Sequence, residues 1–288
     1  MYCYIFYNPL SNNGQNDVKI IELKKKITDK EIIMCDVLDH EDSKEKIANI
    51  SREDQVIIAG GDGTLNYFIN DFGVVTDKLY YYPCGSGNDF TRDLGLNNTL
   101  VHINKYMENL PECYADNIKR KFFNGVGIGI DGYCCVEGEK ERKRTGKKVN
   151  YALIALKGVA KYFKPANAKV EVDGVKKEYK KVWLCVSMKG RFCGGGFMMT
   201  PKQDRLSEDG KISLMVAHNA SKFKILYAFL YVFSGKHTIL KKNVEILTGY
   251  NIKVTFDRPV PMQIDGEGYL DISTYEANAI KKEVKNGI

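Results

Sequence analysis

The first third of the chain alternates short apolar runs with amphipathic stretches, and no other feature constrains the fold as strongly. Runs of strand length separated by segments of helical period predict a parallel sheet covered by helices, because parallel neighbours need a crossover between them. The predicted strands are residues 2–7, 31–37, 55–59 and 79–83, and the predicted helices are residues 17–27, 43–50 and 64–69.

Polar or glycine-rich segments follow three of these predicted strands, at residues 8–14, 60–64 and 83–89. In open sheets of this kind, ligands bind beyond the carboxyl ends of the strands. We therefore expect one composite site at that edge of the sheet.

The second part of the chain has a different texture. Asp173-Gly174 is a strong two-residue hairpin signal between strand-like runs, and further runs indicate a mostly antiparallel sheet. The expected strands are residues 169–172, 176–186, 211–216, 251–256 and 262–264, with helices at residues 150–163 and 221–233. The fold class is therefore α/β plus β-rich: an N-terminal doubly wound domain over residues 1–115, with residues 275–288 returning to it, and a C-terminal domain over residues 116–274.

Composition supports a globular protein. The 288 residues are 44% hydrophobic and 27% charged, which excludes a fibre or a disordered chain. The net charge of +7 favours anionic partners, but no nucleic-acid recognition motif accompanies it, so we expect no nucleic-acid role. No stretch approaches the roughly 20 apolar residues of a spanning helix, and the start lacks a secretory signal. We expect a soluble, cytoplasmic protein.

The eight cysteines are scattered, and the closest pair, Cys134 and Cys135, is adjacent. This spacing matches neither a zinc site nor a disulfide framework. We expect small buried thiols in a reducing compartment.

The segment from Gly60 to Asn66 carries the first chemical signal. A buried strand runs into three glycines and the start of a helix, an arrangement that turns backbone N–H groups and the helix dipole towards an anion. Asp62 sharpens this interpretation, because a carboxylate beside phosphates repels them unless it holds a metal or handles a proton.

A second loop, Gly85-Ser86-Gly87-Asn88-Asp89, also follows a predicted strand and opens a helix. Asn88 or Asp89 taken alone could be an ordinary N-cap. Together, the two loops predict a phosphate site.

At this point the residues resemble the diacylglycerol kinase catalytic-domain superfamily, and in particular its small soluble bacterial lipid kinases. The resemblance covers essentially the whole chain, in the family's order. The matching segments are Asn8-Pro9-Leu10-Ser11, residues 60–66, residues 83–92, residues 124–131, Gly194-Gly195-Gly196 with Pro201 and Asp209-Gly210, and residues 263–267.

The resemblance implies an N-terminal domain of the NAD kinase and diacylglycerol kinase type and a C-terminal antiparallel β-sandwich-like domain. It also implies that the γ-phosphate of ATP is transferred to a lipid hydroxyl, such as that of diacylglycerol, at the inter-domain cleft. ATP and Mg²⁺ are the implied cofactors. The implied nucleotide-binding residues are Asn8, Pro9, Ser11, Gly14, Gly60, Gly61, Asp62, Gly63, Thr64, Asn66, Gly85, Ser86, Asn88 and Asp89.

The resemblance also assigns roles to acidic residues in the second domain. Glu267 matches the family's proton acceptor, with Asp265 close by and Asp62 facing it from the other domain; which carboxylate takes the proton stays open. A second Mg²⁺ site is implied at the Asp209 carboxylate and the main-chain carbonyls of Leu206 and Lys211. A tight turn at Asp209-Gly210 explains the same residues equally well.

Some positions depart from the family pattern. Asn12 and Asn13 stand where the first loop usually has a glycine, Tyr67 replaces an acidic residue, and residues 35–37 lack the usual threonine. These departures bear on the adenine contacts and leave open a non-catalytic nucleotide- or lipid-binding protein. The retained Asp62, Asp265 and Glu267 argue against that alternative.

NAD kinases and phosphofructokinases share the Gly-Gly-Asp-Gly loop, so another small-molecule kinase is also an alternative; residues 83–92 and 265–267 favour a lipid kinase. The expected partners are ATP and a lipid substrate at the inner face of a membrane, and a homodimer is compatible with the sequence. The basic run at residues 137–148 is either a solvated face or a contact with anionic lipid. For the apolar run at residues 225–233, we expect a core helix rather than an acyl-facing surface.

Overall fold

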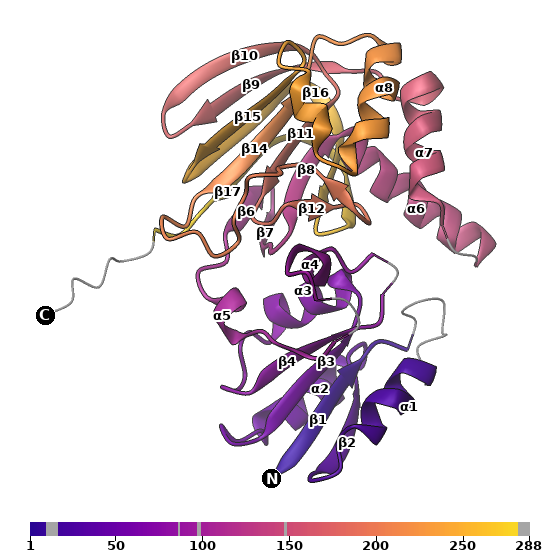
Figure 1. Ribbon diagram of the computed structural model, residues 1–288, viewed down its shortest axis with the longest axis vertical. Helices are drawn as coiled ribbons and strands as arrows, with labels where there is room; N and C mark the ends of the chain where they lie inside the picture. The colour runs from indigo at the N-terminus through magenta and orange to yellow at the C-terminus, as the bar shows by residue number, and fades with distance from the viewer. Residues whose placement is uncertain (10–16, 86, 97–98, 147–148, 282–288) are drawn as a thin grey trace, which may run out of the picture. The chain divides into compact units, whose positions relative to one another are not determined.

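The computed structural model describes residues 1–9, 17–85, 87–96, 99–146 and 149–281 (Figure 1). The chain forms two compact units, Met1–Glu108 and Asn109–Ile288. The first is a mixed α/β unit and the second an antiparallel β unit, which confirms the predicted fold class.

The first unit is built on a sheet of strand order β2-β1-β3-β4-β5. Strands β1 to β4 are parallel, and β5 runs antiparallel to β4. The strands are β1 (Tyr2–Tyr7), β2 (Glu31–Asp36), β3 (Gln55–Gly60), β4 (Leu79–Pro83) and β5 (Val101–His102); the helices are α1 (Asp17–Lys25), α2 (His40–Ala48), α3 (Asp62–Asp71), α4 (Asp89–Asp93) and α5 (Asn104–Met107). The predicted strands and the three predicted helices are present, with small shifts at their ends.

Both faces of the central strand β3 are buried, so its run of apolar residues lies within the core. Cys3, Ile5, Leu23 and Ile57 belong to one buried cluster of this unit. The helices therefore bury the sheet, as the alternating pattern predicts.

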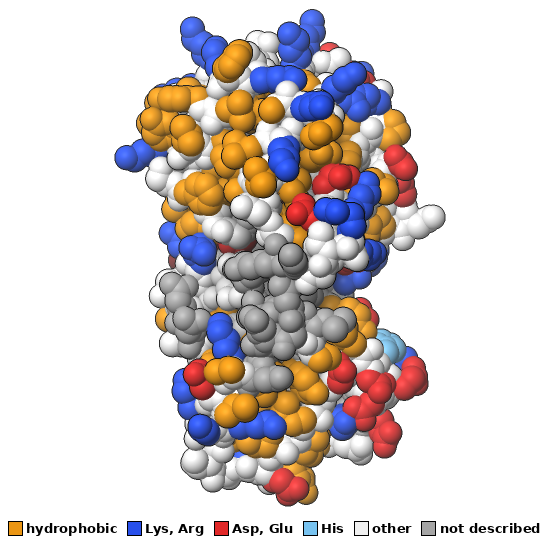
Figure 2. Space-filling model, turned by 90° about the vertical axis from the view of Figure 1, so that its right-hand side faces the viewer, with side chains coloured by type: hydrophobic (Ala, Val, Ile, Leu, Met, Phe, Trp, Pro, Cys, Tyr) orange, Lys and Arg blue, Asp and Glu red, His pale blue; other side chains and the backbone are white. Residues whose placement is uncertain are grey.

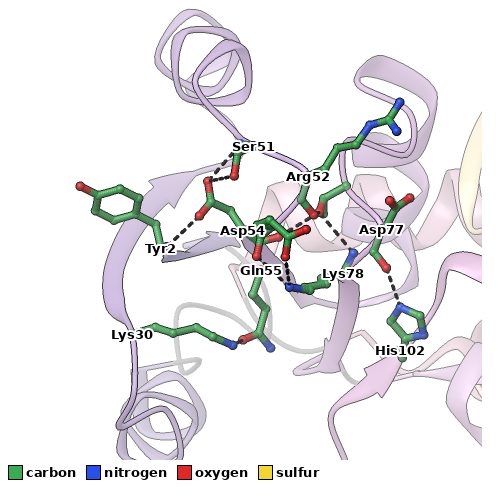
Figure 3. Close-up of polar contacts among 11 residues, drawn as sticks. Tyr2, Lys30, Ser51, Arg52, Asp54, Gln55, Asp77, Lys78 and His102 are labelled. Carbon is green, nitrogen blue, oxygen red and sulfur yellow. Dashed lines mark hydrogen bonds and ion pairs between the residues drawn. The ribbon is translucent and has the colours of Figure 1, made fainter.

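Asp54 ties together the amino ends of the strands, at the edge opposite the glycine-rich loops (Figure 3). Its carboxylate accepts hydrogen bonds from the backbone N–H of Tyr2 at 2.8 Å and of Ser51 at 3.0 Å, and from the Ser51 hydroxyl at 2.9 Å. Burial raises the pKa of Asp54, but these hydrogen bonds outweigh it and leave the pKa below its usual value. This edge of the sheet is held by polar contacts within the protein.

The second unit contains a large sheet of order β15-β14-β11-β8-β16-β17-β6-β7, to which β9 and β10 are added at β16. Its strands are β6 (Glu112–Ala115), β7 (Ile118–Lys121), β8 (Gly125–Gly129), β9 (Ala166–Val172), β10 (Val175–Val182), β11 (Leu184–Met188), β14 (Ile212–Ala217), β15 (Val244–Gly249), β16 (Asn251–Ile264) and β17 (Glu267–Asn278), with a small pair of β12 (Phe192–Cys193) and β13 (Phe197–Met198). Its helical segments are α6 (Ile130–Thr145), α7 (Tyr151–Lys157), the π-helix η2 (Gly158–Tyr162), α8 (Lys222–Val232) and the 3-10 helix η3 (Lys236–Ile239).

The predicted hairpin turn and the starts of two predicted helices are where the sequence places them. Asp173 and Gly174 join β9 to β10 with positive φ angles of 49° and 85°, as a two-residue hairpin turn requires. The side chains of Asn150 and Ser221 accept hydrogen bonds from the first turns of α7 and α8, so both predicted helices begin at ordinary N-caps.

Three expectations about this unit are corrected. The boundary lies between Glu108 and Asn109 rather than after residue 115, because β6 pairs with β17. The residues of β17 that were expected to return to the first domain, 275–278, also pair within the second unit. The strands predicted at 251–256 and 262–264 form one strand, β16, with irregular pairing around Pro259 and Pro261, where a bulge accommodates the missing N–H groups.

Helix α6 is an element that the pattern did not reveal. It includes most of the charged run from residue 137, and the pairs Glu137 with Lys140 and Glu139 with Lys143 lie one turn apart on its surface. The described part of this run is therefore a solvated helical face with its charges balanced along the helix.

Six of the eight cysteines are buried, as predicted, whereas Cys134 and Cys135 are partly exposed; all eight are free thiols. Burial raises the pKa of the Cys84 thiol to about 11, so this side chain behaves as an inert hydrophobe.

Candidate functional site

The phosphate loops of the first unit lie at one edge of its sheet. Strands β1, β3 and β4 are parallel neighbours, and their register places Gly60 beside Pro83. Their carboxyl ends therefore lead into the predicted loops together (Figure 1). The amide of Asn8, after β1, donates to the hydroxyl of Thr64 on α3 at 3.4 Å. Pro9 is described beside it, whereas Ser11, Gly14 and Ser86 lie outside the described residues.

Glycines allow the two glycine-rich loops to touch through their backbones. A Cβ on Gly61 would lie 3.2 Å from the Cα of Gly85, and a Cβ on Gly85 would overlap the Cα of Gly61. A Cβ on Gly60 would lie 2.5 Å from the side chain of Thr64. Gly63 differs, because a Cβ there would meet no described atom within 4 Å. The close approach of the two loops therefore depends on Gly61 and Gly85, and the turn into α3 depends on Gly60.

Asp62 links the same two loops. It is the first residue of α3, and its Oδ2 accepts a hydrogen bond from the backbone N–H of Asp89 at 2.6 Å. Burial, with the negative charge of Asp62 nearby, raises the pKa of the Tyr81 hydroxyl well above its usual range; that hydroxyl donates to the carbonyl of Gly60 at 3.0 Å. The carboxylate thus fixes the two loops relative to each other.

The second loop has a specific local geometry. Asn88 adopts the left-handed conformation with a φ of 42° and directly precedes α4, but its side chain makes no cap hydrogen bond. Instead its amide donates to the carbonyl of Gly85 at 2.7 Å, while its buried Oδ1 has no hydrogen-bond partner among the described residues. The carboxylate of Asp89 lies 3.7 Å from the Arg92 guanidinium. Asn88 therefore stands at the N-cap position of α4, but its side chain does not cap the helix.

Two further observations concern this edge. Lys19 on α1 donates from its ammonium to the carbonyl of Pro83 at 3.2 Å, which brings a positive charge to the end of β4. Sequence reasoning missed Lys19, because no local motif marks a lysine at the third position of a helix. Asn66 is buried within α3 and its Oδ1 accepts from Asn70 at 3.1 Å.

In the second unit, Asp265 organises the turn between β16 and β17. Its carboxylate accepts three backbone hydrogen bonds, from Phe123 at 2.8 Å, Asn124 at 2.9 Å and Gly125 at 2.8 Å. Its own N–H donates to the carbonyl of Gly125 at 3.0 Å. Asp265 is buried and holds the turn to the start of β8.

Glu267 lies two residues further on and has a different environment. Its side chain is 55% exposed, and its Oε2 lies 3.9 Å from the Arg120 guanidinium of β7. Burial, followed by the negative charge of Glu267, raises the pKa of the Tyr269 hydroxyl. Glu267 is thus a solvent-accessible carboxylate held beside a cation, and Arg120 is a neighbour that the sequence did not indicate.

A chain of partly buried hydrogen bonds supports this turn. Asp131, at the start of α6, accepts from the Gln263 amide at 2.7 Å, and Gln263 accepts from the N–H of Gly266 at 2.8 Å. Burial raises the pKa of Asp131 to about 6, although the bond from Gln263 acts in the opposite direction. The two motifs containing Asp131 and Gln263 therefore build one support for the turn that carries Glu267.

Arg205 anchors the other side of the same support. Its buried guanidinium donates to the carbonyl of Phe123 and to Oδ1 of Asn124, the latter at 2.9 Å. Sequence reasoning did not single out Arg205.

The predicted metal loop forms a turn in which Asp209 Oδ1 accepts from the N–H of Lys211 at 3.1 Å, and Asp209 Oδ2 lies 3.3 Å from the Lys211 ammonium. The carbonyl of Lys211 accepts from the Gln203 amide at 3.0 Å. Leu206 donates its N–H to Asp204 at 2.9 Å. Within the described ranges, no group of three or more His, Cys, Asp and Glu side chains is close enough to hold a metal.

Each unit thus assembles its own set of predicted residues. The first brings together Gly60, Gly61, Asp62, Gly85 and Asp89, and the second brings together Asp131, Gln263, Asp265 and Glu267. In the part of the chain that the structure covers, no helix is both long enough and apolar enough to cross a membrane.

Two protein-family models match the chain, one in each unit. The model described as "Diacylglycerol kinase catalytic domain" matches residues 3–114, and the model described as "YegS C-terminal NAD kinase beta sandwich-like domain" matches residues 124–277. The two matches include both loop motifs and the turn with Glu267.

Curated relatives and solved structures agree with these matches. The chain is 24% identical over 230 residues to a proposed lipid kinase of Bacillus subtilis, YtlR, and the match covers 74% of each chain. It is 26% identical over 196 residues to a diacylglycerol kinase of Mycobacterium tuberculosis, covering 65% of this chain and 62% of that protein. A crystal structure of a proposed diacylglycerol kinase from Bacillus anthracis superimposes with a TM-score of 0.68 at 19% identity, over 97% of this chain and 92% of the other, which shows a shared fold.

Proposed function

Because the chain belongs to the diacylglycerol kinase-like family of lipid kinases, we propose that it transfers the γ-phosphate of ATP to the hydroxyl group of a membrane lipid such as diacylglycerol. The hydroxyl oxygen forms a bond to the γ-phosphorus, the bond to the β-phosphate oxygen breaks, and ADP leaves. The hydroxyl proton passes to a carboxylate of the protein. Such a reaction demands mainly positioning and charge stabilisation from the protein.

The observation that carries this proposal is the glycine contact between the two loops of the first unit. Gly61 and Gly85 touch through their backbones, and Asp62 holds the second loop by the N–H of Asp89. Loops without side chains at the end of parallel strands leave backbone N–H groups accessible, and such groups bind phosphate oxygens well. We assign the triphosphate to this edge, with Lys19 as a further positive charge.

We assign the proton acceptor to Glu267 rather than to Asp265. The carboxylate of Asp265 accepts three backbone N–H bonds, and these stabilise its charged form and occupy its oxygens. The side chain of Glu267 is more than half exposed, and the Arg120 guanidinium lies 3.9 Å from its carboxylate. Asp265 is therefore a positioning residue, which sets the turn from which Glu267 projects.

Magnesium is the proposed metal. When bound, Mg²⁺ neutralises the charge of the phosphate oxygens, and Asp62 is the carboxylate that would hold it at the loops. At Asp209 the carboxylate and the carbonyls of Leu206 and Lys211 are hard oxygen donors of the kind Mg²⁺ prefers. An ion bound there would take over the place of the Lys211 ammonium, which now lies 3.3 Å from the carboxylate.

Phosphoryl transfer to mixed micelles of diacylglycerol, with ATP and Mg²⁺, tests the proposal. Glu267→Gln should lower kcat by at least about a hundredfold, because general-base catalysis contributes a factor of this order. The matched control is Glu276→Gln on the same strand, where the exposed carboxylate pairs with Lys253 at 2.8 Å; this variant should keep its activity.

The same assay separates the alternatives when NAD and a long-chain alcohol replace diacylglycerol. Phosphorylation of NAD alone would assign the chain to a different acceptor class. If ATP consumption stays at background with every acceptor, the kinase proposal fails. Normal turnover of Glu267→Gln would remove Glu267 from the mechanism and leave the kinase proposal in place.

A further inference from the structure

Helix α8 has apolar side chains on two of its faces. Its inner face packs on the core of the second unit: Ile225 and Leu226 contact the buried cluster around Trp183, and Val232 is buried. A second apolar row faces outwards. Its members recur at helical spacing and are largely exposed: Phe223 by 84%, Tyr227 by 53% and Leu230 by 71%. The prediction of a core helix at residues 225–233 therefore holds for the inner row only, because the outer row is largely exposed.

Neighbouring segments extend the outer row. The ammonium of Lys222 on α8 donates to the carbonyl of Ala160 in η2 at 2.8 Å, so α8 and the end of α7–η2 are adjacent. Exposed apolar residues on these segments and on η3, together with the outer row, form what we call the helical patch: Leu153, Leu156, Tyr162, Phe223, Tyr227, Leu230, Tyr231, Phe233 and Ile239. Figure 2 shows hydrophobic side chains gathered over this unit, with lysines and arginines among them.

The two segments that contain the helical patch carry charges of one sign. Residues 149–165 and 217–244, which contain the whole patch, carry eight lysines and no aspartate or glutamate. The chain as a whole has 36 acidic residues in 288, so their absence from these two segments is a local feature. The neighbouring helix α6 contrasts with them, since it carries four acidic and four basic residues.

We propose that the helical patch docks on the surface of an anionic lipid bilayer. Phenylalanine and leucine would enter the boundary between head groups and acyl chains, tyrosine hydroxyls would stay at head-group level, and lysines would reach lipid phosphates. With 11 residues, α8 is too short to span and would lie along the interface. A second copy of the chain fits less well, because two patches on lysine-rich segments would repel each other.

Docking on a bilayer would place the chain where a lipid hydroxyl is available, so it rests on the proposed lipid kinase function. Because the lysines of these segments attract anionic head groups electrostatically, binding should require anionic lipid and weaken with salt.

Vesicle sedimentation without ATP tests it. The wild-type chain is mixed with vesicles of phosphatidylcholine, or of phosphatidylcholine with phosphatidylglycerol. We expect binding to the anionic vesicles only. The triple variant Phe223→Ser, Tyr227→Ser, Leu230→Ser should bind at least tenfold more weakly, and each of Lys161→Gln, Lys224→Gln and Lys236→Gln about fivefold more weakly.

Matched controls are exposed residues elsewhere. Val175→Ser with Leu270→Ser replaces apolar side chains that are 73% and 54% exposed, and Lys176→Gln with Lys180→Gln removes two exposed lysines of β10. These variants should bind like the wild type. All substitutions are at the surface, so unchanged thermal midpoints will show that each variant is folded.

Three results would overturn the inference: no binding of the wild type to anionic vesicles, equal binding by the triple variant, or a dimer in solution that the triple variant dissociates while vesicles stay unbound. Activity toward a short-chain, water-dispersed diacylglycerol separates this failure from that of the proposed function. A chain that phosphorylates the dispersed acceptor but ignores vesicles is a kinase without this docking surface, and one that binds vesicles through the patch but never transfers phosphate contradicts the kinase alone.

Discussion

At the scale of single residues, the structure separates carboxylates that look alike in the sequence. Asp131, Asp265 and Glu267 all fall within matching motifs, yet Asp131 is half-buried beside an amide, Asp265 accepts three backbone N–H groups, and Glu267 is exposed. Their chemistry follows from those neighbours, since desolvation and hydrogen bonding act on the charged form in opposite directions.

Asp131 gives a pH dependence that can be measured. Its pKa is raised to about 6 in the fold by burial and is near 3.9 when unfolded, so the folded state binds the proton more tightly. Its contribution to the free energy of unfolding is therefore full below about pH 4 and is lost as the pH rises through 6. Asp131→Asn should not show this loss. Near neutral pH its free energy of unfolding should therefore exceed that of the wild type by up to about 3 kcal/mol.

Urea unfolding of both proteins at a series of pH values measures this difference. Glu178→Gln, at an exposed carboxylate of β10, is the control and should follow the wild type throughout. A constant difference between Asp131→Asn and the wild type from acid to neutral pH would mean that Asp131 does not titrate in this range.

At the scale of elements, the loops after β3 and β4 depend on the absence of a side chain at one contact. Gly85→Ala places a methyl group on the Cα of Gly61, so the loops must separate, at a cost of about 1–3 kcal/mol. We expect at least a tenfold weaker affinity for ATP, because the backbone donors move with the loops.

Gly63→Ala is the control in the same loop, since its methyl group meets no described atom within 4 Å. Titration calorimetry with ATP and Mg²⁺ compares the two variants, and Gly63→Ala should keep the wild-type affinity. If Gly85→Ala also binds ATP normally, the glycine contact does not form the triphosphate site.

Elements also differ in how far local pattern predicts them. Strand β1 and the caps of α7 and α8 follow from alternation and from Asn150 and Ser221. Helix α6 does not, because its first residues lie against β16 while the rest carries charges on all sides. Gly132 in α6 illustrates the reason: a Cβ there would overlap the backbone of Pro261, a contact that no local pattern encodes.

At the scale of the whole molecule, the two units have separate buried clusters. The single tryptophan, Trp183, is buried in the second unit, where its indole N–H donates to the carbonyl of Ala220 at 3.1 Å. Its fluorescence therefore reports on that unit, whereas circular dichroism reports on both.

The Asp54→Ala variant tests whether the two units unfold separately, because the two signals report on different parts of the chain. It removes the acceptor of three hydrogen bonds in the first unit and should cost that unit about 1–3 kcal/mol. The circular dichroism transition in urea should begin earlier, while the fluorescence midpoint stays unchanged. The control is Glu53→Gln at the neighbouring exposed residue. Equal shifts of both signals would show that the two units unfold as one.

The sequence by itself determined the order of strands and helices in the first unit, the two glycine-rich loops, the hairpin turn at Asp173-Gly174 and the family, because these depend on side-chain periodicity and on backbone conformations that few residues adopt. Only the tertiary structure decided the roles of the acidic residues and of α8. Asp265 meets its N–H donors about 140 positions away in the chain, and the outer row of α8 is exposed because the inner row already fills the space against the core. Contacts of that kind depend on how distant segments pack, which local spacing does not specify.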